Sequence, residues 1–157
     1  MKRHELEHLI RAAGAITGAD EIVVIGSQAD WFTFRDPKDS DLIDGSIGEG
    51  SPFHETFGYD AQGVWEDTAT LPAGWRERLI RIQNENTRNV TALCLDPHDL
   101  AVSKLVAGRE KDRVFIQEMH RHQMRDESVL LQRIARLTLA QDGRRALRQR
   151  WHRIVHG

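Results

Sequence analysis

The sequence predicts an α/β protein: a small mixed sheet with flanking helices, followed by a helical C-terminal extension. Two observations lead to this prediction. Short β-branched and aromatic runs bounded by Gly, Asp and Asn recur between residues 21 and 96, which is the pattern of strands and turns. From residue 97 onward, apolar residues recur at helical spacing. A chain of 157 residues has the length of one domain with an extension, so we expect a core of residues 1–112 and a helical extension of residues 113–157.

The N-terminal part is expected to contain a first helix and five strands, with at most one short helix between the second and third strands. Apolar residues recur every three or four positions in RHELEHLIRAAGAI, residues 3–16, so this segment is predicted to form an amphipathic helix. The Gly-, Asp- and Ser-rich segment that begins at Arg35 is expected to hold at most one short helix, around Ser40 to Ile47. NTRN (86–89) suits a hairpin turn. The expected strands are EIVVIG (21–26), WFTF (31–34), a short one near Tyr59 to Val64, RERLIRIQNE (76–85) and NVTALCLD (89–96).

The clearest boundary is the helix start in DPHDLAVSK. Asp96 can cap this helix and Pro97 suits its first position, while Asp99 places negative charge at the positive end of the helix dipole. Beyond it, Gly143 is expected to separate the last two helices, and two apolar stripes should pack those helices into a core. The stripes are Leu130, Ile134 and Leu137, and then Leu147, Trp151, Ile154 and Val155.

The net charge of −2 hides an uneven distribution. Between Arg133 and His156 there are seven arginines and one acidic residue, Asp142, so this tail carries +6 and the rest of the chain −8. A basic tail on an acidic body is compatible with a contact inside the chain, with binding of a polyanion, or with a solvated helix face.

Cysteine usage and hydropathy exclude two classes of protein. The single Cys94 rules out a disulfide framework within the chain. No apolar stretch approaches the roughly 20 residues of a membrane span, and MKRHELEHLI has charges where a signal peptide needs an apolar core. We therefore expect a cytoplasmic protein that does not insert into membranes.

The first expected strand ends in a motif suited to phosphate. Gly26 allows a sharp turn without a Cβ clash. Backbone amides and the hydroxyl of Ser27 can then face phosphate oxygens. Such Gly-Ser pairs are also common in ordinary turns, so this motif has to be weighed with others.

A basic run follows the second helix start, in PHDLAVSKLVAGREKD (97–112). Lys104, Arg109 and Lys111 are expected on or just after one helix, and Lys104 and Lys111 would share a face. Asp112 ends the run and could hold a cation or orient the two bases. By itself, such a run is also typical of a solvated face.

Taken together, these motifs resemble the nucleotidyltransferase fold of the polymerase-β type. A strand ending in Gly-Ser, further strands, and P-x-D-L-x-x-x-K-L-x-A-x-R-x-K-D make up the resemblance. More narrowly, DLIDGSIGEGSPFHETFGY (41–59) and TLPAGWRERLIRI (70–82) make the chain similar to small bacterial nucleotidyltransferase-like proteins related to AbiEii-type toxin transferases. The resemblance covers Glu5 to about Phe115; the remainder matches only in being helical.

The resemblance implies transfer of a nucleoside monophosphate from a nucleoside triphosphate (NTP) to a hydroxyl on RNA, a protein or a small molecule. Two acidic residues on the second strand would bind two divalent metals, and Mg²⁺ is expected because oxygen ligands and phosphates suit it. Asp112 would support the site as the later aspartate. The residues implied to bind the nucleotide are Gly26, Ser27, Lys104, Arg109 and Lys111.

The chain departs from the family pattern at the acidic pair, because only two residues separate Ser27 from Asp30. In one placement, ADWFTF is the metal strand, Asp30 is its carboxylate, and the partner is missing because Gln28 stands in its position. In the other, DSDL supplies the metal pair, with Asp39 and Asp41 pointing the same way on an extended segment. We prefer the first, because WFTFRDPKDSDLIDG resembles the segment that follows the metal strand in that family.

Three functions follow. The leading one is nucleotidyl transfer by a two-metal mechanism. The alternatives are a degenerate, non-catalytic member that binds nucleotide or a partner, and a nucleic-acid-binding module that uses the arginine-rich C-terminal helices. With one carboxylate missing, the first placement predicts very slow transfer or none, and the second predicts normal activity. The last helix could pack onto a second copy of the chain as a homodimer, and a toxin role would rest on family analogy.

Overall fold

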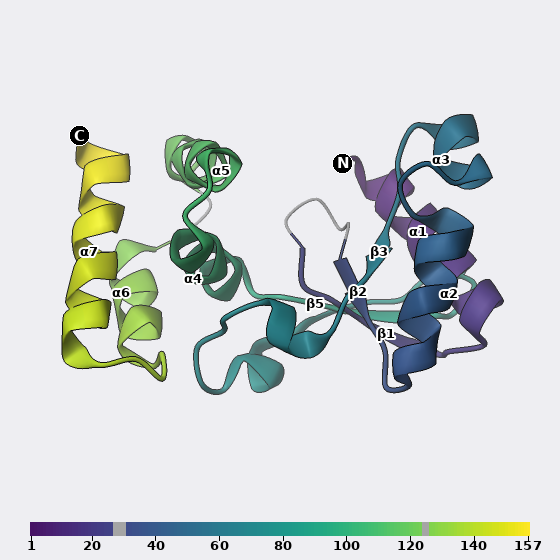
Figure 1. The fold of residues 1–157 in the computed structure, drawn as a ribbon, viewed down its shortest axis with the longest axis horizontal. Coiled ribbons are helices and arrows are strands. Elements are labelled where there is room, and N and C mark those ends of the chain that lie inside the picture. The colour runs from purple at the N-terminus through teal and green to yellow at the C-terminus, as the bar shows by residue number, and fades with distance from the viewer. Residues whose placement is uncertain (27–30, 124–125) are drawn as a thin grey trace. The chain divides into compact units, whose positions relative to one another are not determined.

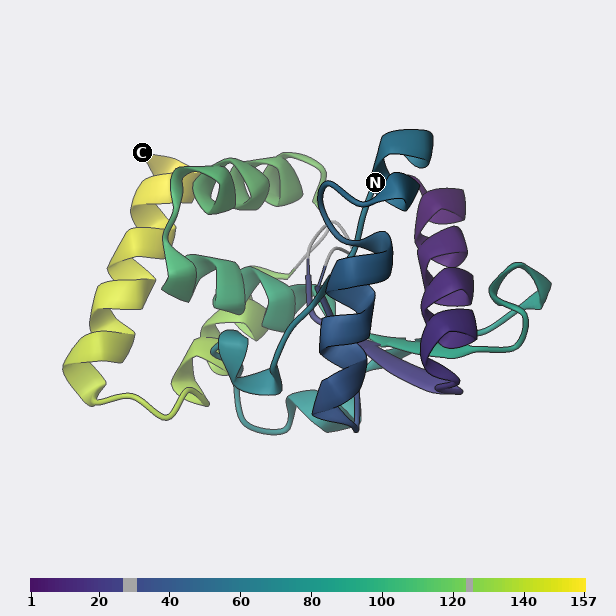
Figure 2. The ribbon, with the colours of Figure 1, turned by 45° about the vertical axis from the view of Figure 1, so that its right-hand side comes forward.

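The structure is a computed structural model that describes residues 1–26, 31–123 and 126–157. Its contacts divide the chain into two compact units (Figures 1 and 2). The first, which we call the sheet unit, consists of Met1–Thr68 and Leu79–Leu95; the second, the helical unit, consists of Ala69–Arg78 and Asp96–Gly157. The predicted α/β class is confirmed, with a mixed sheet followed by helices.

The sheet has five strands in the order β3-β2-β1-β5-β4. β1 pairs in parallel with β5 and antiparallel with β2, and β4 pairs antiparallel with β5. Each strand lies inside a segment predicted to be extended, but all are shorter than those segments. The strands are β1 (Glu21–Val24), β2 (Trp31–Thr33), β3 (Gln62–Gly63), β4 (Ile80–Ile82) and β5 (Thr91–Cys94).

The connections in the sheet unit include short 3₁₀ turns. The β4–β5 hairpin turns through η3 (Glu85–Thr87), and β3 is followed by η1 (Glu66–Thr68). The first three residues of the predicted strand RERLIRIQNE are not extended: Arg76–Arg78 lie in a further 3₁₀ turn, η2 (Trp75–Arg78), which belongs to the helical unit.

Three helices accompany the sheet: α1 (Arg3–Thr17), α2 (Pro37–Ile47) and α3 (Pro52–Phe57). The predicted first helix is confirmed, and α2 is the short helix expected near Ser40, begun by Asp36, whose side chain accepts the N–H of Lys38 at 3.0 Å. α3 was not predicted, although Ser51 caps it by accepting the N–H of His54 at 3.2 Å. α1 and α2 pack against each other and the sheet (Figure 1) around a common core. The core is Leu9, Ile10, Ala13, Ile22, Val24, Phe32, Ile43, Ile47, Ala61 and Ala92.

The helical unit consists mainly of four helices: α4 (Pro97–Ala107), α5 (Glu110–Arg121), α6 (Glu127–Ala135) and α7 (Gln141–His156). The predicted apolar stripes pack as expected, with Leu130, Ile134, Leu147 and Trp151 buried in one core. Gly143 does not separate the last two helices, because it lies in the first turn of α7. No helix in the described part of the chain is both long and apolar enough to cross a membrane.

The limits of the compact units are not those of the predicted domains. Residues 96–112, expected in the core of residues 1–112, belong to the helical unit. The reason is packing, because Ala101, Val102 and Leu105 of α4 are buried in the core formed with α5, α6 and α7. As a division into domains, the boundary after residue 112 stays a prediction.

Candidate functional site

Three chain segments meet at one edge of the sheet. Because β1 and β5 are parallel, with Val24 opposite Cys94, both strands end at this edge, and the N–H of Leu95 donates to the carbonyl of Val24 at 3.2 Å. β2 begins there, since the N–H of Ile25 donates to the carbonyl of Trp31 at 3.0 Å. In open α/β sheets, ligands bind outside the carboxyl ends of parallel strands. Gly26 follows directly at this edge.

The preferred placement of the metal-binding carboxylate, at Asp30, falls between β1 and β2. Ser27, Gln28 and Asp30 lie outside the described residues, so their predicted roles stay predictions. The adjoining part of the expected metal strand is extended as predicted, since Trp31–Thr33 form β2.

The second placement of the acidic pair fails on local geometry. Asp39 and Asp41 were expected on an extended segment, but both lie in α2. Residues two apart on an α-helix project about 200° apart around its axis, so the two carboxylates do not point the same way. Within residues 1–26, 31–123 and 126–157, no group of three or more His, Cys, Asp or Glu side chains is arranged to hold a metal ion.

The basic run is divided between two helices. α4 ends at Ala107, and Gly108 caps it in the left-handed conformation with φ 66°, which glycine adopts without a Cβ penalty. α5 then begins at Glu110. The expectation that Lys104 and Lys111 share one helical face is therefore wrong, and Lys111 lies exposed on α5.

Asp112 connects the other two bases across this break. Nζ of Lys104 lies 3.3 Å from Oδ1 of Asp112, and Nε of Arg109 donates to Oδ2 at 2.7 Å. The side chain of Asp112 is fully buried, whereas that of Arg109 is 43% exposed. Nζ of Lys104 also lies 5.4 Å from the ring centre of Phe115. This is an arrangement in which Asp112 can orient both bases; its role in catalysis stays a prediction.

The charge of this cluster follows from its hydrogen bonds. Burial alone raises the pKa of the Asp112 carboxyl, but hydrogen bonds from Arg109 and Lys104 outweigh burial, so the pKa lies below its ordinary value. Asp112 is therefore ionised at neutral pH. Two cations and one anion leave a net charge of about +1 with which the cluster can attract a phosphate.

A second buried carboxylate, Asp99, forms ion pairs with two arginines that are distant from it in the sequence. Asp99 is fully buried and accepts hydrogen bonds from Nε and Nη2 of Arg78 at 2.8 and 2.9 Å. Nη1 of Arg133 lies 3.1 Å from both Asp99 and Asp96. No local motif predicts these pairs, because Arg78 is 21 residues from Asp99 and lies in a run that reads as a strand.

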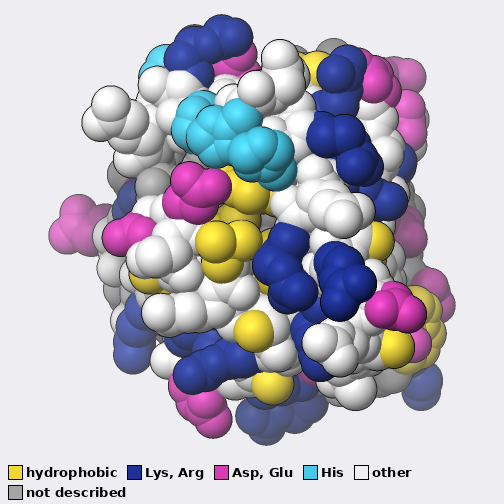
Figure 3. All heavy atoms as spheres, turned by 90° about the vertical axis from the view of Figure 1, so that its left-hand side faces the viewer, with side chains coloured by type: hydrophobic (Ala, Val, Ile, Leu, Met, Phe, Trp, Pro, Cys, Tyr) yellow, Lys and Arg dark blue, Asp and Glu magenta, His cyan; other side chains and the backbone are white. Residues whose placement is uncertain are grey.

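The arginines of α7 fall into two groups. Arg144 and Arg150 donate to main-chain carbonyls, of Leu139 at 2.6 Å and of Leu105 at 2.7 Å. The others are Arg145, Arg148 and Arg153, and within the described ranges their side chains make no hydrogen bond or ion pair. Figure 3 shows Lys and Arg side chains gathered on one face of the molecule beside a group of histidines.

Charge is divided between the two units. The sheet unit has seven Lys and Arg against fifteen Asp and Glu, a net charge of −8, and the helical unit has fifteen against nine, a net charge of +6. The basic excess that the sequence shows in the tail is therefore a property of the helical unit.

Comparison with known proteins gives one finding on family. The model of a family described as nucleotidyltransferases of unknown function (DUF6036) matches residues 4–155. No curated protein and no solved structure matches the chain.

Proposed function

The chain belongs to this family of nucleotidyltransferases of unknown function, and from that premise we propose that it transfers a nucleoside monophosphate from an NTP to a hydroxyl acceptor. In this reaction the acceptor oxygen attacks the α-phosphorus, the bond from that phosphorus to the bridging oxygen breaks, and pyrophosphate leaves while the hydroxyl proton passes to a base. The observation that supports the proposal most directly is the family match over residues 4–155.

The sheet unit supplies the proposed phosphate turn. We assign it to Gly26 and Ser27, which follow β1 where β1 and β5 end side by side. A turn at the carboxyl end of a buried strand can present amide N–H groups to phosphate oxygens. In the helical unit, Lys104, Arg109 and Lys111 are the cations we assign to the triphosphate.

The proposed metal is Mg²⁺, which would offset phosphate charge when bound. The described residues do not offer a set that fits it, because Asp39 and Asp41 diverge on α2. Asp30 is therefore the carboxylate we assign to the metal, and Asp112 the residue that orients Lys104 and Arg109.

The test is a transfer assay on a chain whose intact mass agrees with 18.0 kDa. The chain is incubated with Mg²⁺, each α-labelled NTP in turn, and bulk RNA or protein as acceptor. We expect slow labelling that is lost in Asp30→Asn and retained in Asp41→Asn, its matched control. Labelling lost in Asp41→Asn but retained in Asp30→Asn would contradict this assignment. Nucleotide binding without any labelling would instead support a non-catalytic member of the family.

A second candidate function is nucleic-acid binding by α7, which the +6 charge of the helical unit favours. Arg145, Arg148 and Arg153 have no acidic partner among the described residues, and Arg145 and Arg153 are exposed. Each phosphate contact with a single strand should add about −0.7 to the slope of log K against log[salt].

This candidate predicts a salt-dependent affinity for RNA. Replacing the three arginines by glutamine should flatten the slope by about two, whereas Arg121→Gln on α5 should leave it unchanged. An equal slope in the triple variant would rule out α7 as the contact. A role of the kind seen in toxin transferases would require growth arrest that depends on Asp30 when the chain is expressed.

A further inference from the structure

A pocket in the helical unit is separate from every residue assigned above except Lys104 and Arg153. It lies between α4, α5 and α7 and has a volume of about 320 Å³, within the size range of small-molecule sites. Its wall contains four cations, Lys104, Arg113, Arg150 and Arg153. None of the described residues that line it is acidic.

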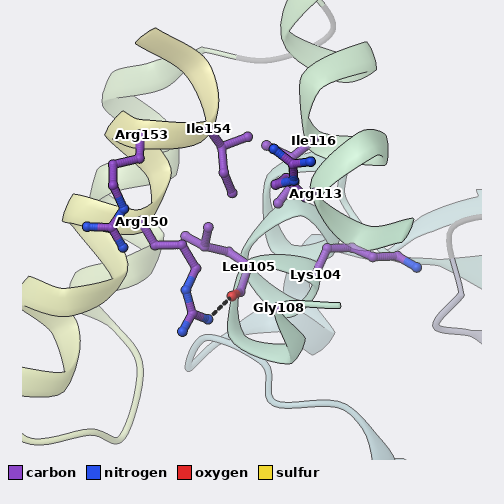
Figure 4. A pocket seen from close by; sticks show the side chains of 8 residues that line it. All are labelled: Lys104, Leu105, Gly108, Arg113, Ile116, Arg150, Arg153 and Ile154. Carbon is purple, nitrogen blue, oxygen red and sulfur yellow. Dashed lines mark hydrogen bonds between the residues drawn. The ribbon is translucent and has the colours of Figure 1, made fainter. Parts of the chain in front are cut away.

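The floor of the pocket is aliphatic. Leu105 and Ile116 are almost completely buried, and Ile154 of α7 lies partly buried against the same core. In Figure 4, Arg150 extends from α7 toward the carbonyl of Leu105 and Arg113 lies on α5, while the guanidinium of Arg153 lies farther from Leu105 than that of Arg150, and the Lys104 side chain extends away from the floor. Its ammonium is the one that lies 3.3 Å from Asp112, so the cations left to face a ligand are the three arginines.

Arg150 is held in place before any ligand binds. Its Nη1 donates to the carbonyls of Leu105 and Val106 at 2.7 and 3.5 Å, at the negative end of the α4 dipole. Gly108 makes room for it, since a Cβ there would lie 2.8 Å from that nitrogen. A guanidinium has five N–H donors, so Arg150 keeps donors for a ligand.

The other two arginines are available at small cost. Arg113 pairs with Glu110 on its own helix, and the two side chains are 50% and 73% exposed, so solvent screens the pair and its contribution to stability is small. Arg153 is exposed and its side chain forms no hydrogen bond or ion pair with the described residues.

We propose that this pocket binds a small phosphate-bearing molecule whose apolar part rests on Ile154, which packs against the buried core that contains Leu105 and Ile116. Guanidinium groups match the geometry of phosphate oxygens, and three of them line the pocket. Among the described residues, the carboxylate that competes for one of them is Glu110, which pairs with Arg113 outside the lining. The aliphatic floor favours an organic phosphate, such as a nucleotide, over inorganic phosphate or pyrophosphate. The proposal does not depend on nucleotidyl transfer.

The test uses protein labelled with ¹³C at isoleucine methyl groups and titrated with ADP, pyrophosphate or adenosine. ADP should shift the Ile116 and Ile154 signals saturably, while pyrophosphate and adenosine should bind at least tenfold more weakly. Arg153→Gln and Arg113→Gln should each weaken ADP binding at least tenfold, and Arg121→Gln should not. Each variant is checked for an unchanged methyl spectrum without ligand, so that loss of folding is not read as loss of binding.

Two results would overturn the proposal: no shift of Ile116 and Ile154 with ADP, or the same shifts in Arg153→Gln and Arg113→Gln as in the parent. Binding at the sheet edge is reported separately by Ile25, which precedes Gly26. A shift of Ile25 alone would therefore reject this pocket and leave the proposed transfer site standing.

Discussion

Arg78 and Asp99 form a two-pronged buried ion pair, with N–O distances of 2.8 and 2.9 Å. Asp99 is fully buried and the Arg78 side chain is 16% exposed. The pair fixes the turn η2 to the first turn of α4. Asp99 also forms an ion pair with Arg133. One carboxylate therefore pairs with two guanidinium groups that have little access to water.

Asp99→Ala should therefore be strongly destabilising. Removing the carboxylate leaves the mostly buried guanidinium of Arg78 without its anionic partner and leaves Arg133 with Asp96 alone. Breaking a buried ion pair in this way typically lowers the free energy of unfolding by about 3–5 kcal/mol. Urea denaturation followed by circular dichroism measures it. The matched control is Glu118→Ala, since Glu118 is 45% exposed in its pair with Arg121 and should change stability by about 1 kcal/mol or less. Similar effects from both substitutions would refute the buried role of Asp99.

Two glycines should respond in opposite directions to alanine. Gly108 has φ 66° and a Cβ there would lie 2.8 Å from Arg150, so Gly108→Ala should cost about 1–2 kcal/mol through the left-handed backbone. Gly45 lies inside α2 with nothing within 4 Å of an added Cβ, so Gly45→Ala should stabilise by about 0.5–1 kcal/mol. Thermal unfolding of both variants checks the signs, and a stabilising Gly108→Ala would contradict the described cap.

Glu7 should make stability depend on pH in the acid range. Hydrogen bonds from Arg3, Asn84 and Asn86 lower the pKa of Glu7 from 4.5 to about 2. The unfolded chain therefore binds more protons between these values, and stability rises with pH there. The contribution of Glu7 is complete above pH 4.5 and is lost as the pH falls toward 2. Glu7→Gln should flatten the stability profile in this window, and an unchanged profile would mean that the three hydrogen bonds do not form.

Trp151 should be the most sensitive position of α7. Its side chain is 1% exposed, and its Nε1–H donates to Glu127 at 2.9 Å. Trp151→Ala should lower the free energy of unfolding by about 3–5 kcal/mol, and Trp151→Phe by less, because most of the apolar volume remains. Glu127→Gln keeps an acceptor for the indole and serves as the control. Equal losses from Phe and Ala would show that the hydrogen bond, and not packing, dominates.

The fold was largely predictable because its signals are local. Apolar spacing at Leu9, Ile10 and Ala13 marks α1, and the Asp96–Pro97 start marks α4. Local signals also explain the errors. The Ser51–Pro52 start of α3 was present but outweighed by the surrounding Gly and Asp. Gly143 predicts a break between the last two helices, but it lies in the first turn of α7. The residues of α7 that pack into the core, Leu147 and Trp151, come after it.

The candidate site was less predictable because its geometry is not local. The run from Lys104 to Asp112 is visible in the sequence, but the break at Gly108 decides which of its side chains meet. The helical state of Asp39 and Asp41 follows from the cap at Asp36 and could have been inferred from Asp36–Pro37, the same start used for α4. The partners of Asp99 lie 21 and 34 residues away, where no spacing rule reaches.

The segment Ala69–Arg78 belongs to the helical unit although sheet-unit residues flank it on both sides. This segment contacts residues that follow it in the chain and are therefore synthesised later. Arg78 pairs with Asp99, and the N–H of Ala73 donates to the carbonyl of Arg136 at 3.0 Å. The nascent chain reaches Asp99 at the start of α4, and Arg136 only after α6, so the contacts of this segment with these residues form in that order. The helical unit can therefore close only late in translation, and no single proteolytic cut can release either unit with all of its own residues.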